Sequence, residues 1–450
     1  MRKLLIILGI RIDDLAMPEA LERVDEFIAI GRATGKSHQI ATVNADFVVK
    51  SLGDPELRLI LQEADLATAD GMPLVWGARL LGVPLEGRVT GADLVPALAE
   101  RAARNGYSLY LLGAAPGIAQ RAGAILQAQH PQLKIVGMYS PPNKTVLEMD
   151  EAVVENIRAV KPDILFVAFG NPKQEKWISM HARTLHVPAM IGVGGTLDFI
   201  AGATRRAPAW MQTRGLEWIH RLLQEPRRLW KRYVVDLFGF GYFFARQWWA
   251  LRKRGAPVAA LPSAEMMLVN QTPILGVAGN LDTTNALAFS HAIERALALR
   301  AYVIVNLERA TFIDSRGMGA LVGGAKHARD AGGDLVLVGA PPQIKHALEL
   351  ARLDKFFELH DSVARALPRQ VAPRAPETRG AWTIIPAPRR FDATTAPEFL
   401  EHHLARLAHH PRVILDFAGT IFLASAGMAA LIKLDRQAKQ AGGGLRIAGC

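Results

Sequence analysis

The chain has 450 residues, half of them hydrophobic and 21% charged, with a formal net charge of +11 and one cysteine. This composition excludes wholesale disorder, and the single Cys450 excludes a disulfide framework within the chain and a cysteine-based zinc site. A reducing, cytoplasmic environment is therefore expected. At about 100–200 residues per domain, the length predicts two to four domains.

The N-terminal apolar run, residues 4–10, is predicted to be a first β-strand. It follows Met1-Arg2-Lys3 and so imitates a signal peptide, but no small-residue cleavage site comes after it, and the charged segment 11–14 does. No stretch of the sequence reaches the about 18 uninterrupted apolar residues of a membrane-spanning helix.

Residues 1–204 alternate short apolar runs with helical patterns, which predicts an α/β fold with a Rossmann-like parallel sheet and helices on both faces. The expected strands are Gln39–Val43, Leu66–Ala69, Ser108–Leu112, Leu133–Val136, Ile164–Phe169 and Pro188–Val193. The expected helices are Met17–Ile30, Asp54–Ala64, Leu94–Ala103, Ile118–Gln129 and Met149–Val160.

Asp70 follows the strand Leu66–Ala69 directly and precedes Gly71 and a helix opened by Pro73. In parallel sheets, ligands bind beyond the carboxyl ends of the strands, where this loop lies. From the local sequence alone, Asp70 can be a general base, a ribose-binding group or the N-cap of the next helix.

Other strand ends carry loops suited to ligands. Gly113 to Gly117 lead into a helix, where freed amides suit a diphosphate or form a plain tight turn. Gly170 to Trp177 combine amides, charges and an aromatic ring, which suits a sugar or base as well as an ordinary polar loop. With Thr42–Asn44, Asp70-Gly71 and Gly194–Asp198, these loops are expected along one edge of the sheet.

A series of motifs resembles the WecG/TagA/CpsF glycosyltransferases, glycosyltransferase family 26, over roughly residues 4–235. The motifs are Thr42–Asp46, Ala69–Pro73, Arg88–Leu94, Gly170–Glu175, Gly194–Phe199, Arg206–Met211 and Gly215–Trp218, in that order.

The resemblance implies transfer of N-acetylmannosamine or a related N-acetylhexosamine from a UDP-sugar to a polyprenyl-diphosphate-linked saccharide, in surface polysaccharide synthesis, with inversion and without metal or cofactor. It places the catalytic Asp on Asp70, a neighbouring polar residue on Thr42 and an active-site Arg on Arg88. Candidate substrate-binding residues are Asn44, Gly71, Gly113, Gly117, Asn171, Gln174, Gly195, Arg221 and Arg228.

These residue types fit that chemistry. In a single displacement a base takes the proton of the acceptor hydroxyl while UDP leaves, a role open to Asp70. Arg88 and the Gly113–Gly117 amides can stabilise the departing diphosphate. The Asp-x-Asp pair typical of metal-dependent transferases is missing from residues 1–260. A dinucleotide oxidoreductase is disfavoured because the Gly113 loop lacks the spaced glycine fingerprint.

Residues 205–254 hold twelve Lys or Arg against three acidic residues, and five of the eight Trp. Such a basic, aromatic segment, with a helix break at Pro226, predicts an amphipathic appendage at the inner face of the cell membrane. The resemblance adds that its arginines, here Arg221 and Arg228, help close the site. The alternatives are a packed helix with a solvated basic face and a nucleic-acid surface, which no motif supports.

Beyond a linker at 255–264 the sequence repeats itself at a spacing of 110 residues: Leu281–Ala286 matches Phe391–Ala396, and Tyr302–Leu307 matches Arg412–Phe417. The pattern in each copy is strand, strand, helix, strand, helix, strand. Two copies of one small α/β domain are expected, at 265–367 and 381–450, joined by a linker at 368–380.

The segment Phe312–Leu321 resembles the phosphorylation loop of STAS domains, the domains of sulfate transporters and anti-sigma factor antagonists. The resemblance implies a kinase-type anti-sigma partner that phosphorylates Ser315; alternatively, Ser315 only caps the helix. In the second copy Ala424 replaces Asp314, and the sequence stops at the strand 445–450, so this copy is expected to be truncated or degenerate.

The sequence thus predicts a UDP-sugar transferase, cytoplasmic and peripherally bound to the membrane, with STAS-mediated regulation. The rival hypothesis is a signalling scaffold with switchable STAS domains and an inactive transferase-like domain.

Overall fold

The computed structural model describes residues 4–141, 151–252, 265–367, 377–379, 382–407, 410–420 and 422–449. The chain forms two compact units, each assembled from three separate segments. The first comprises residues 1–23, 40–97 and 202–368, and the second comprises residues 24–39, 98–201 and 369–450. The predicted linker at 255–264, most of the linker at 368–380 and the start of the helix predicted at Met149 lie outside the described residues.

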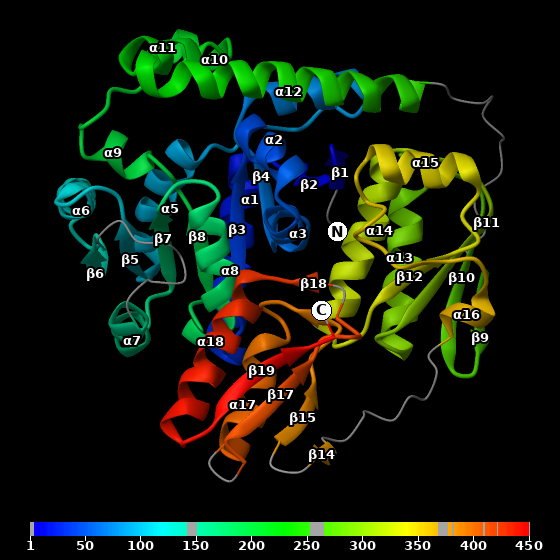
Figure 1. Ribbon diagram of the computed structural model, residues 1–450. Coiled ribbons are helices and arrows are strands. Elements are labelled where there is room, and N and C mark those ends of the chain that lie inside the picture. Colours follow the sequence, from blue (N-terminus) through cyan, green and yellow to red (C-terminus); the bar gives the residue numbers. More distant parts are fainter. Residues whose placement is uncertain are drawn as a thin grey trace. The chain divides into compact units, whose positions relative to one another are not determined.

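The fold is α/β, as predicted, and its main sheet has six strands in the order β4-β3-β8-β7-β5-β6 (Figure 1). This is not the 3-2-1-4-5-6 order of dinucleotide-binding folds. The strands are β3 His38–Val43, β4 Leu66–Ala69, β5 Ser108–Gly113, β6 Lys134–Tyr139, β7 Ile164–Ala168 and β8 Ala189–Gly192. Strands β3, β4, β7 and β8 are buried throughout, which explains why they are continuous apolar runs in the sequence.

Helices alternate with these strands, and the helices expected from the sequence lie close to their predicted positions. They are α1 Met17–Thr34, α2 Ala45–Gly53, α3 Pro55–Glu63, α4 Met72–Leu80, α5 Gly91–Asn105, α6 Ile118–Gln129, α7 Glu151–Val160, α8 Lys173–Leu185, α9 Thr196–Ile200, α10 Ala209–Thr213, α11 Glu217–Gln224 and α12 Pro226–Arg252. Helix α12 continues the chain beyond Pro226 as one long helix (Figure 1).

The prediction of a single N-terminal strand was wrong in one respect. Residues 4–13 form an antiparallel hairpin, β1 Leu4–Ile7 and β2 Ile10–Asp13, which is a sheet of its own. Leu8 and Gly9 turn the chain with φ of 50° and 83°, the left-handed conformations of a tight hairpin turn. A Cβ on Gly9 would also lie 2.4 Å from the carbonyl oxygen of Ala351, so this turn requires glycine.

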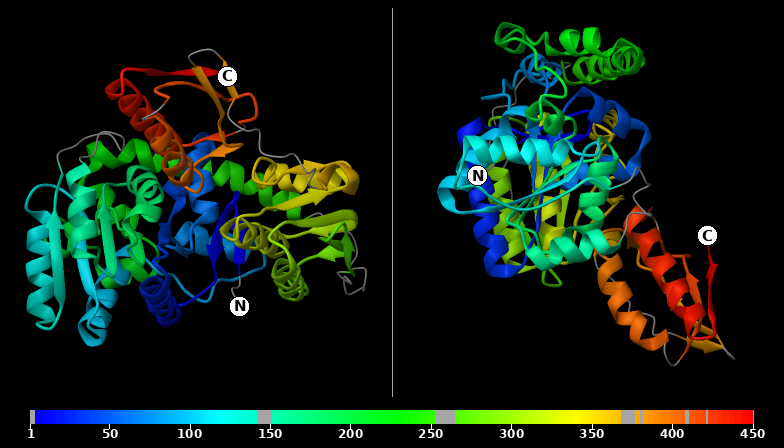
Figure 2. Two further views of the ribbon diagram at one scale, coloured as in Figure 1. Left: turned by 90° about the horizontal axis from the view of Figure 1, so that it is seen from below. Right: turned by 90° about the vertical axis from the view of Figure 1, so that its left-hand side faces the viewer.

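The first repeat forms a five-stranded sheet in the order β13-β12-β11-β10-β9 within the first unit (Figure 2). Its odd-numbered core residues, such as Leu275 and Leu337, pack under α13 and α14, and the even-numbered Ile304 and Val336 face α16. The elements are β9 Glu265–Val269, β10 Thr272–Leu281, α13 Ala286–Leu299, β11 Val303–Ile313, α14 Ser315–Asp330, β12 Leu335–Val338, α15 Pro342–Leu350, β13 Leu359–His360 and α16 Val363–Ala366.

The second repeat lies in the second unit and has a sheet in the order β14-β15-β17-β19 and a short pair, β16 with β18. Its core packs against Met180 of α8, and Arg183 donates to the carbonyl oxygen of Thr394 at 2.9 Å. The elements are β14 Glu377–Arg379, β15 Trp382–Pro386, β16 Arg390–Phe391, α17 Ala396–Leu407, β17 Arg412–Asp416, β18 Phe422–Leu423, α18 Ser425–Gln440 and β19 Gly444–Ala448.

Candidate active site

Asp70 stands where β4 ends, and the residue is half-buried. Its amide donates to the carbonyl oxygen of Val43 at 2.7 Å, and its carboxylate accepts from the amide of Gly91 at 3.4 Å. The N-cap of α4 is Gly71, without any side-chain cap bond. Asp70 is therefore not the helix cap that its position in the sequence allows.

The surroundings of Asp70 hold its proton more firmly than water would. Removal of the carboxylate from solvent is the main cause that raises its pKa to about 7, and the nearby charge of Glu217 acts in the same direction. The Gly91 amide and the charges of Arg88 and Arg221 act in the opposite direction. A carboxyl group with a pKa near neutrality can accept a proton and release it again at physiological pH.

Arginines and carboxylates surround this position in the first unit. Arg88 lies 3.8 Å from Glu217, and Arg206 lies 3.6 Å from a second oxygen of Glu217 and 2.6 Å from Asp93. Although burial raises the pKa of Asp93, hydrogen bonds from Arg206 and Thr90 leave it below its usual value. The cluster thus holds fixed guanidinium groups, which suit phosphate oxygens.

Thr42 and Asn44 come from the neighbouring strand β3 and the turn after it. Thr42 is buried and pairs across the sheet with Thr68. The Asn44 side chain accepts from the amide of Phe47 at 3.3 Å and so caps α2. A Cβ on Gly71 would lie 3.4 Å from that of Asn44, so these two predicted residues are neighbours.

In the second unit, Gly113 and Gly117 shape the loop between β5 and α6. Gly113 has a φ of 105°, and a Cβ there would lie 2.7 Å from the carbonyl oxygen of Ala168. Gly117 has a φ of 81° and begins α6 without a side-chain cap bond. The first amides of α6 are therefore not used by a capping side chain, as the diphosphate hypothesis requires.

Gln174 is almost completely buried at the start of α8. Its side-chain oxygen accepts from the amides of Gly170 at 3.1 Å and Gly194 at 3.0 Å, and its nitrogen donates to Glu175 at 2.8 Å. The oxygen of this amide thus holds together the loops that follow β7 and β8, while the nitrogen binds the carboxylate of the next residue in α8. Asn171 lies in the first of these loops, and Gly195 begins α9 in the second.

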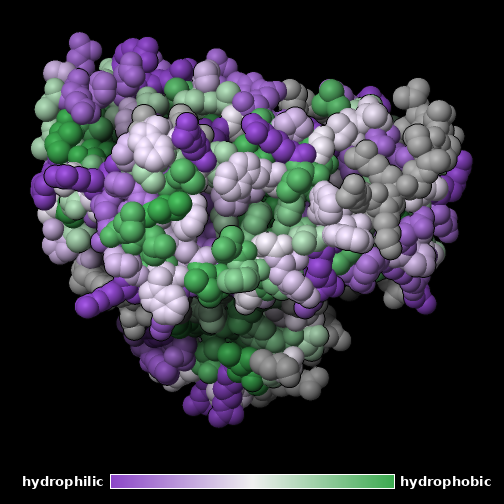
Figure 3. Space-filling view, turned by 90° about the horizontal axis from the view of Figure 1, so that it is seen from above, coloured by the Kyte–Doolittle hydropathy of each residue, from purple (hydrophilic) through white to green (hydrophobic). Residues whose placement is uncertain are grey.

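Helix α12 of the predicted appendage has two faces. On its inner face, Phe240 and Phe244 are buried in the same core as β3 and β4, and Arg232 lies 3.0 Å from Asp46 of α2. On its outer face large apolar side chains are exposed among basic ones (Figure 3). These are Trp230, Val234, Val235, Leu237, Phe238, Tyr242 and Trp249.

The appendage contributes Arg221 of α11 to the surroundings of Asp70 through its charge. Arg228 belongs to α12, and its side chain lies outside the described residues. Among the described residues, no helix combines the length and the apolar character needed to cross a membrane. Within the same residues, no group of three or more His, Cys, Asp or Glu side chains is placed to hold a metal ion.

Ser315 begins α14 but does not cap it. The cap is Asp314, which accepts from the amides of Arg316 and Gly317 at 2.8 and 2.9 Å. Ser315 is 2% exposed, and its hydroxyl has no hydrogen-bond partner among the described residues. The capping alternative for Ser315 was therefore wrong. In the second repeat the cap position is Ala424, which makes no side-chain cap bond.

Sequence reasoning did not assign roles to Glu217, Arg206 and Asp93. Each belongs to a quoted motif, but only the fold brings Glu217 close to both Arg88 and Arg206. The sequence did offer one indication of their role, because three motifs that are far apart in the sequence each contain one of these charged residues.

Comparisons with known proteins relate the chain to two families. The family model described as "Glycosyl transferase WecG/TagA/CpsF family" matches residues 5–254, and the STAS domain model matches residues 264–366 and 372–450. N-acetylglucosaminyldiphosphoundecaprenol N-acetyl-beta-D-mannosaminyltransferases of Staphylococcus aureus strains MW2 and NCTC 8325 are each 32% identical over 232 residues. Each alignment covers 52% of this chain and 89% of the relative.

Solved anti-sigma factor antagonists are also similar to part of the chain. One from Thermotoga maritima is 24% identical with a TM-score of 0.22, covering 23% of this chain and 90% of that one. Unphosphorylated SpoIIAA is 21% identical with a TM-score of 0.21, covering 23% of this chain and 91% of that one. The STAS assignment here rests on the family model. Because the family model matches residues 5–254, which contain the parallel sheet, the chain belongs to the WecG/TagA/CpsF family of glycosyltransferases, and it carries two STAS domains C-terminal to the transferase.

Proposed function

We propose that the chain transfers an N-acetylhexosamine of the N-acetylmannosamine type from a UDP-sugar to a polyprenyl-diphosphate-linked saccharide, with inversion and without a metal. The observation that carries the proposal is Asp70: a carboxyl group with a pKa of about 7 at the end of β4, close to the charges of Arg88 and Arg221. The names of the Staphylococcus aureus relatives support the same donor sugar and the same kind of acceptor.

In the proposed step, Asp70 takes the proton of the acceptor hydroxyl as that oxygen attacks the anomeric carbon from the face opposite UDP. The bond between sugar and diphosphate breaks, and UDP carries away the electron pair. Arg88, with Arg206 and Arg221 nearby, offsets the charge that develops on the diphosphate. Thr42, buried in β3, is proposed to support the strand end that carries the base.

The remaining predicted residues are proposed to bind or shape the substrate sites. Asn44 and Gly71 lie together beside Asp70, and the loop of Gly113 and Gly117 offers amides to a diphosphate. Gln174 is proposed to position the loops of Asn171 and Gly195 around the substrate, because its side-chain amide binds both loops. Arg221 and Arg228 are proposed to close over the diphosphate.

We assign the outer face of α12 to the cytoplasmic membrane surface, where a polyprenyl-linked acceptor resides. Exposed Trp230, Phe238 and Trp249 provide the apolar and aromatic contact, and the surrounding Lys and Arg attract anionic lipids. Peripheral attachment through this face would place the acceptor and the transferase at the same boundary.

The STAS domains are proposed to regulate the transferase through a kinase-type anti-sigma partner and phosphorylation of Ser315. A phosphate there would add charge between Asp314 and Arg316 and change the surface at the start of α14. We expect Ser315→Asp to change retention of a candidate anti-sigma kinase in a pull-down, because the new charge alters this surface. Ser425→Asp, in the uncapped second copy, is the matched control, and equal behaviour of the two variants would contradict the assignment.

The test of the proposed function is a UDP-release screen over several UDP-sugars with a synthetic polyprenyl-diphosphate-linked N-acetylglucosamine acceptor. We expect acceptor-dependent release from UDP-N-acetylmannosamine, unchanged by a chelator, and a product of inverted anomeric configuration by NMR. Loss of activity with chelator would contradict the metal-free mechanism. Absence of transfer from every donor would favour the scaffold hypothesis instead.

A further inference from the structure

The first STAS domain and the transferase share one core within the first unit. Helix α14 packs against strand β1, and Gly319 makes room for it: a Cβ on Gly319 would lie 2.9 Å from the Cβ of Leu4. A Cβ on Gly323, one turn later, would lie 3.0 Å from a methyl group of the same leucine. Ile6 is buried in the STAS core beside Met318. The two domains therefore meet in close apolar packing.

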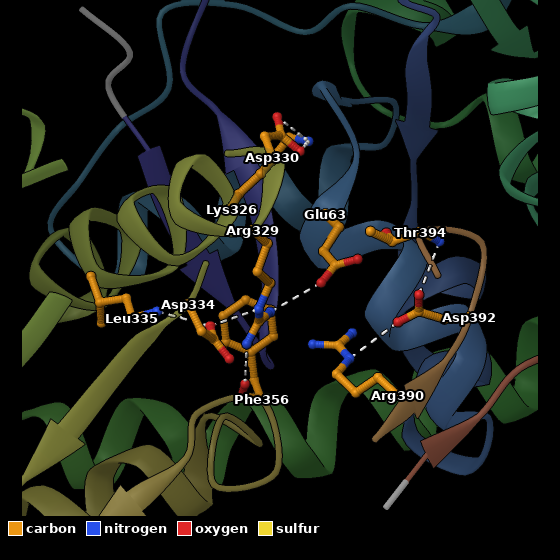
Figure 4. A network of polar contacts seen from close by, with 10 residues as sticks. All are labelled: Glu63, Lys326, Arg329, Asp330, Asp334, Leu335, Phe356, Arg390, Asp392 and Thr394. Atoms are coloured by element: carbon orange, nitrogen blue, oxygen red, sulfur yellow. Dashed lines mark hydrogen bonds and ion pairs between the residues drawn. The ribbon is translucent and has the colours of Figure 1, made fainter. Parts of the chain in front are cut away.

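Three ion pairs surround this packing. Arg316 lies 2.8 Å from Asp14, Lys326 lies 3.2 Å from Asp65, and Arg329 lies 3.0 Å from Glu63. Figure 4 shows Arg329 extending over the ring of Phe356 between Glu63 and Asp334. The three cations come from α14, and in each of the three pairs the acidic partner, Asp14, Asp65 or Glu63, comes from the transferase.

One of the three pairs continues toward the active site. The carboxylate of Asp14 is 2% exposed and divides its oxygens between two donors: Arg316 at 2.8 Å and the amide of Glu86 at 2.7 Å. Glu86 stands two residues before Arg88. Lys326 and Arg329 contact Asp65 and Glu63, which lie before β4, at the end remote from Asp70.

The segment 86–91 is held at both ends. Asp14 binds its first amide, the carbonyl oxygen of Val89 accepts from Thr68 at 2.9 Å, and the amide of Gly91 binds the Asp70 carboxylate. Arg88 stands between these fixed points, and its charge lowers the pKa of Asp70. Release of the Glu86 end would therefore free Arg88 to move relative to the base.

We propose that Arg316 of the first STAS domain is a positioning residue of the transferase site, acting through Asp14 and the Glu86 amide on Arg88. Without the guanidinium, Asp14 is a buried carboxylate that has lost the cation facing it from α14, and it turns toward water and gives up Glu86. Docking of the STAS domain and the state of the transferase site are then coupled, and the coupling acts in both directions. The inference rests on the proposed function for its catalytic consequence.

The experiment compares Arg316→Ala and Arg316→Lys with Lys326→Ala in the full chain. Lys326→Ala removes an ion pair from the same helix and the same interface, but one that does not bind segment 86–91. We expect Arg316→Ala to lower kcat/KM about tenfold or more, as for loss of a charge-assisted hydrogen bond, and to move the acidic limb of the pH–rate profile to higher pH. Lys326→Ala should keep the wild-type profile, and Arg316→Lys should recover most of it.

Hydrogen–deuterium exchange supplies a readout independent of turnover. Peptides covering residues 86–91 should exchange about tenfold faster in Arg316→Ala and unchanged in Lys326→Ala. Equal exchange and equal pH profiles in the two variants would overturn the inference. If Arg316→Ala does not fold, Arg316→Gln, which keeps a donor but not the charge, replaces it in the same comparison. A wild-type chain without transfer would refute the proposed function, while the exchange result would still decide whether Arg316 holds this segment.

Discussion

Replacing Asp70 by Asn is expected to abolish sugar transfer while the protein stays folded and still binds the UDP-sugar. The amide has the size of the carboxylate and can still accept from Gly91, but it cannot take a proton from the acceptor hydroxyl. Loss of a general base lowers rates by about 100- to 10,000-fold. Turnover is measured by UDP release with the synthetic acceptor, and donor binding by calorimetry with UDP-N-acetylmannosamine.

The matched control is Asp65→Asn, at the opposite end of the same strand. Asp65 faces Lys326 and not the site, so this variant should transfer sugar at close to the wild-type rate. Turnover by Asp70→Asn within a few-fold of wild type would remove Asp70 from the chemistry.

The pH dependence of transfer follows from the same carboxyl group. Because burial raises the pKa of Asp70 to about 7, the base is protonated below that pH and ionised above it. The rate should fall about tenfold per pH unit below neutrality and level off above it. A profile that stays flat down to pH 5 would contradict the assignment of Asp70 as the base.

Replacing Trp230, Phe238 and Trp249 together by Ser is expected to release the protein from membranes. These side chains are 50%, 72% and 66% exposed, so their removal leaves the core intact. A fully buried large apolar side chain contributes about 1.5–3 kcal/mol, and even partial insertion predicts a loss of partition of about a hundredfold or more. Sedimentation with vesicles of phosphatidylglycerol and phosphatidylcholine measures this loss.

The control for the membrane variant is Leu299→Ser, an exposed apolar residue of α13 outside the appendage. It should bind vesicles as the wild type does. Transfer to a water-soluble, short-chain acceptor should survive in the triple variant, whereas transfer to vesicle-embedded acceptor should fall. Undiminished vesicle binding by the triple variant would show that α12 is not the attachment surface. Deletion of residues 205–254 is a poorer test, because it also removes Phe240 and Phe244 from the core.

The parallel sheet could be predicted because its strands are buried on both faces and are therefore short, continuous apolar runs. Leu66–Ala69 and Ile118–Gln129 were predicted to the residue. The surroundings of Asp70 could not be predicted in the same way. Glu217 reaches Arg88 only through the fold of the appendage, and no local pattern encodes that distance.

Two local rules failed where long-range contacts compete with them. Asp before a helix usually caps it, but the Asp70 carboxylate binds the Gly91 amide, and Gly71 is the N-cap. Ser at the start of α14 also fits a cap, but Asp314 precedes it and takes the same amides. The apolar run 4–10 was predicted as one strand instead of a hairpin. The need for glycine at position 9 comes from its contact with Ala351, which is far away in the sequence.

Strand β1 is apolar on both sides because each side belongs to a different domain: Leu5 and Ile7 lie in the transferase core, and Ile6 lies in the STAS core. During synthesis, Leu4 leaves the ribosome long before Gly319 and Gly323, the residues that accommodate it. At about 5–20 residues per second, this strand waits roughly 15–60 s for its second partner. Strand β1 is thus translated long before α14 but completes its packing only with it, and a chain that ends before the first STAS domain leaves this hairpin open to other molecules.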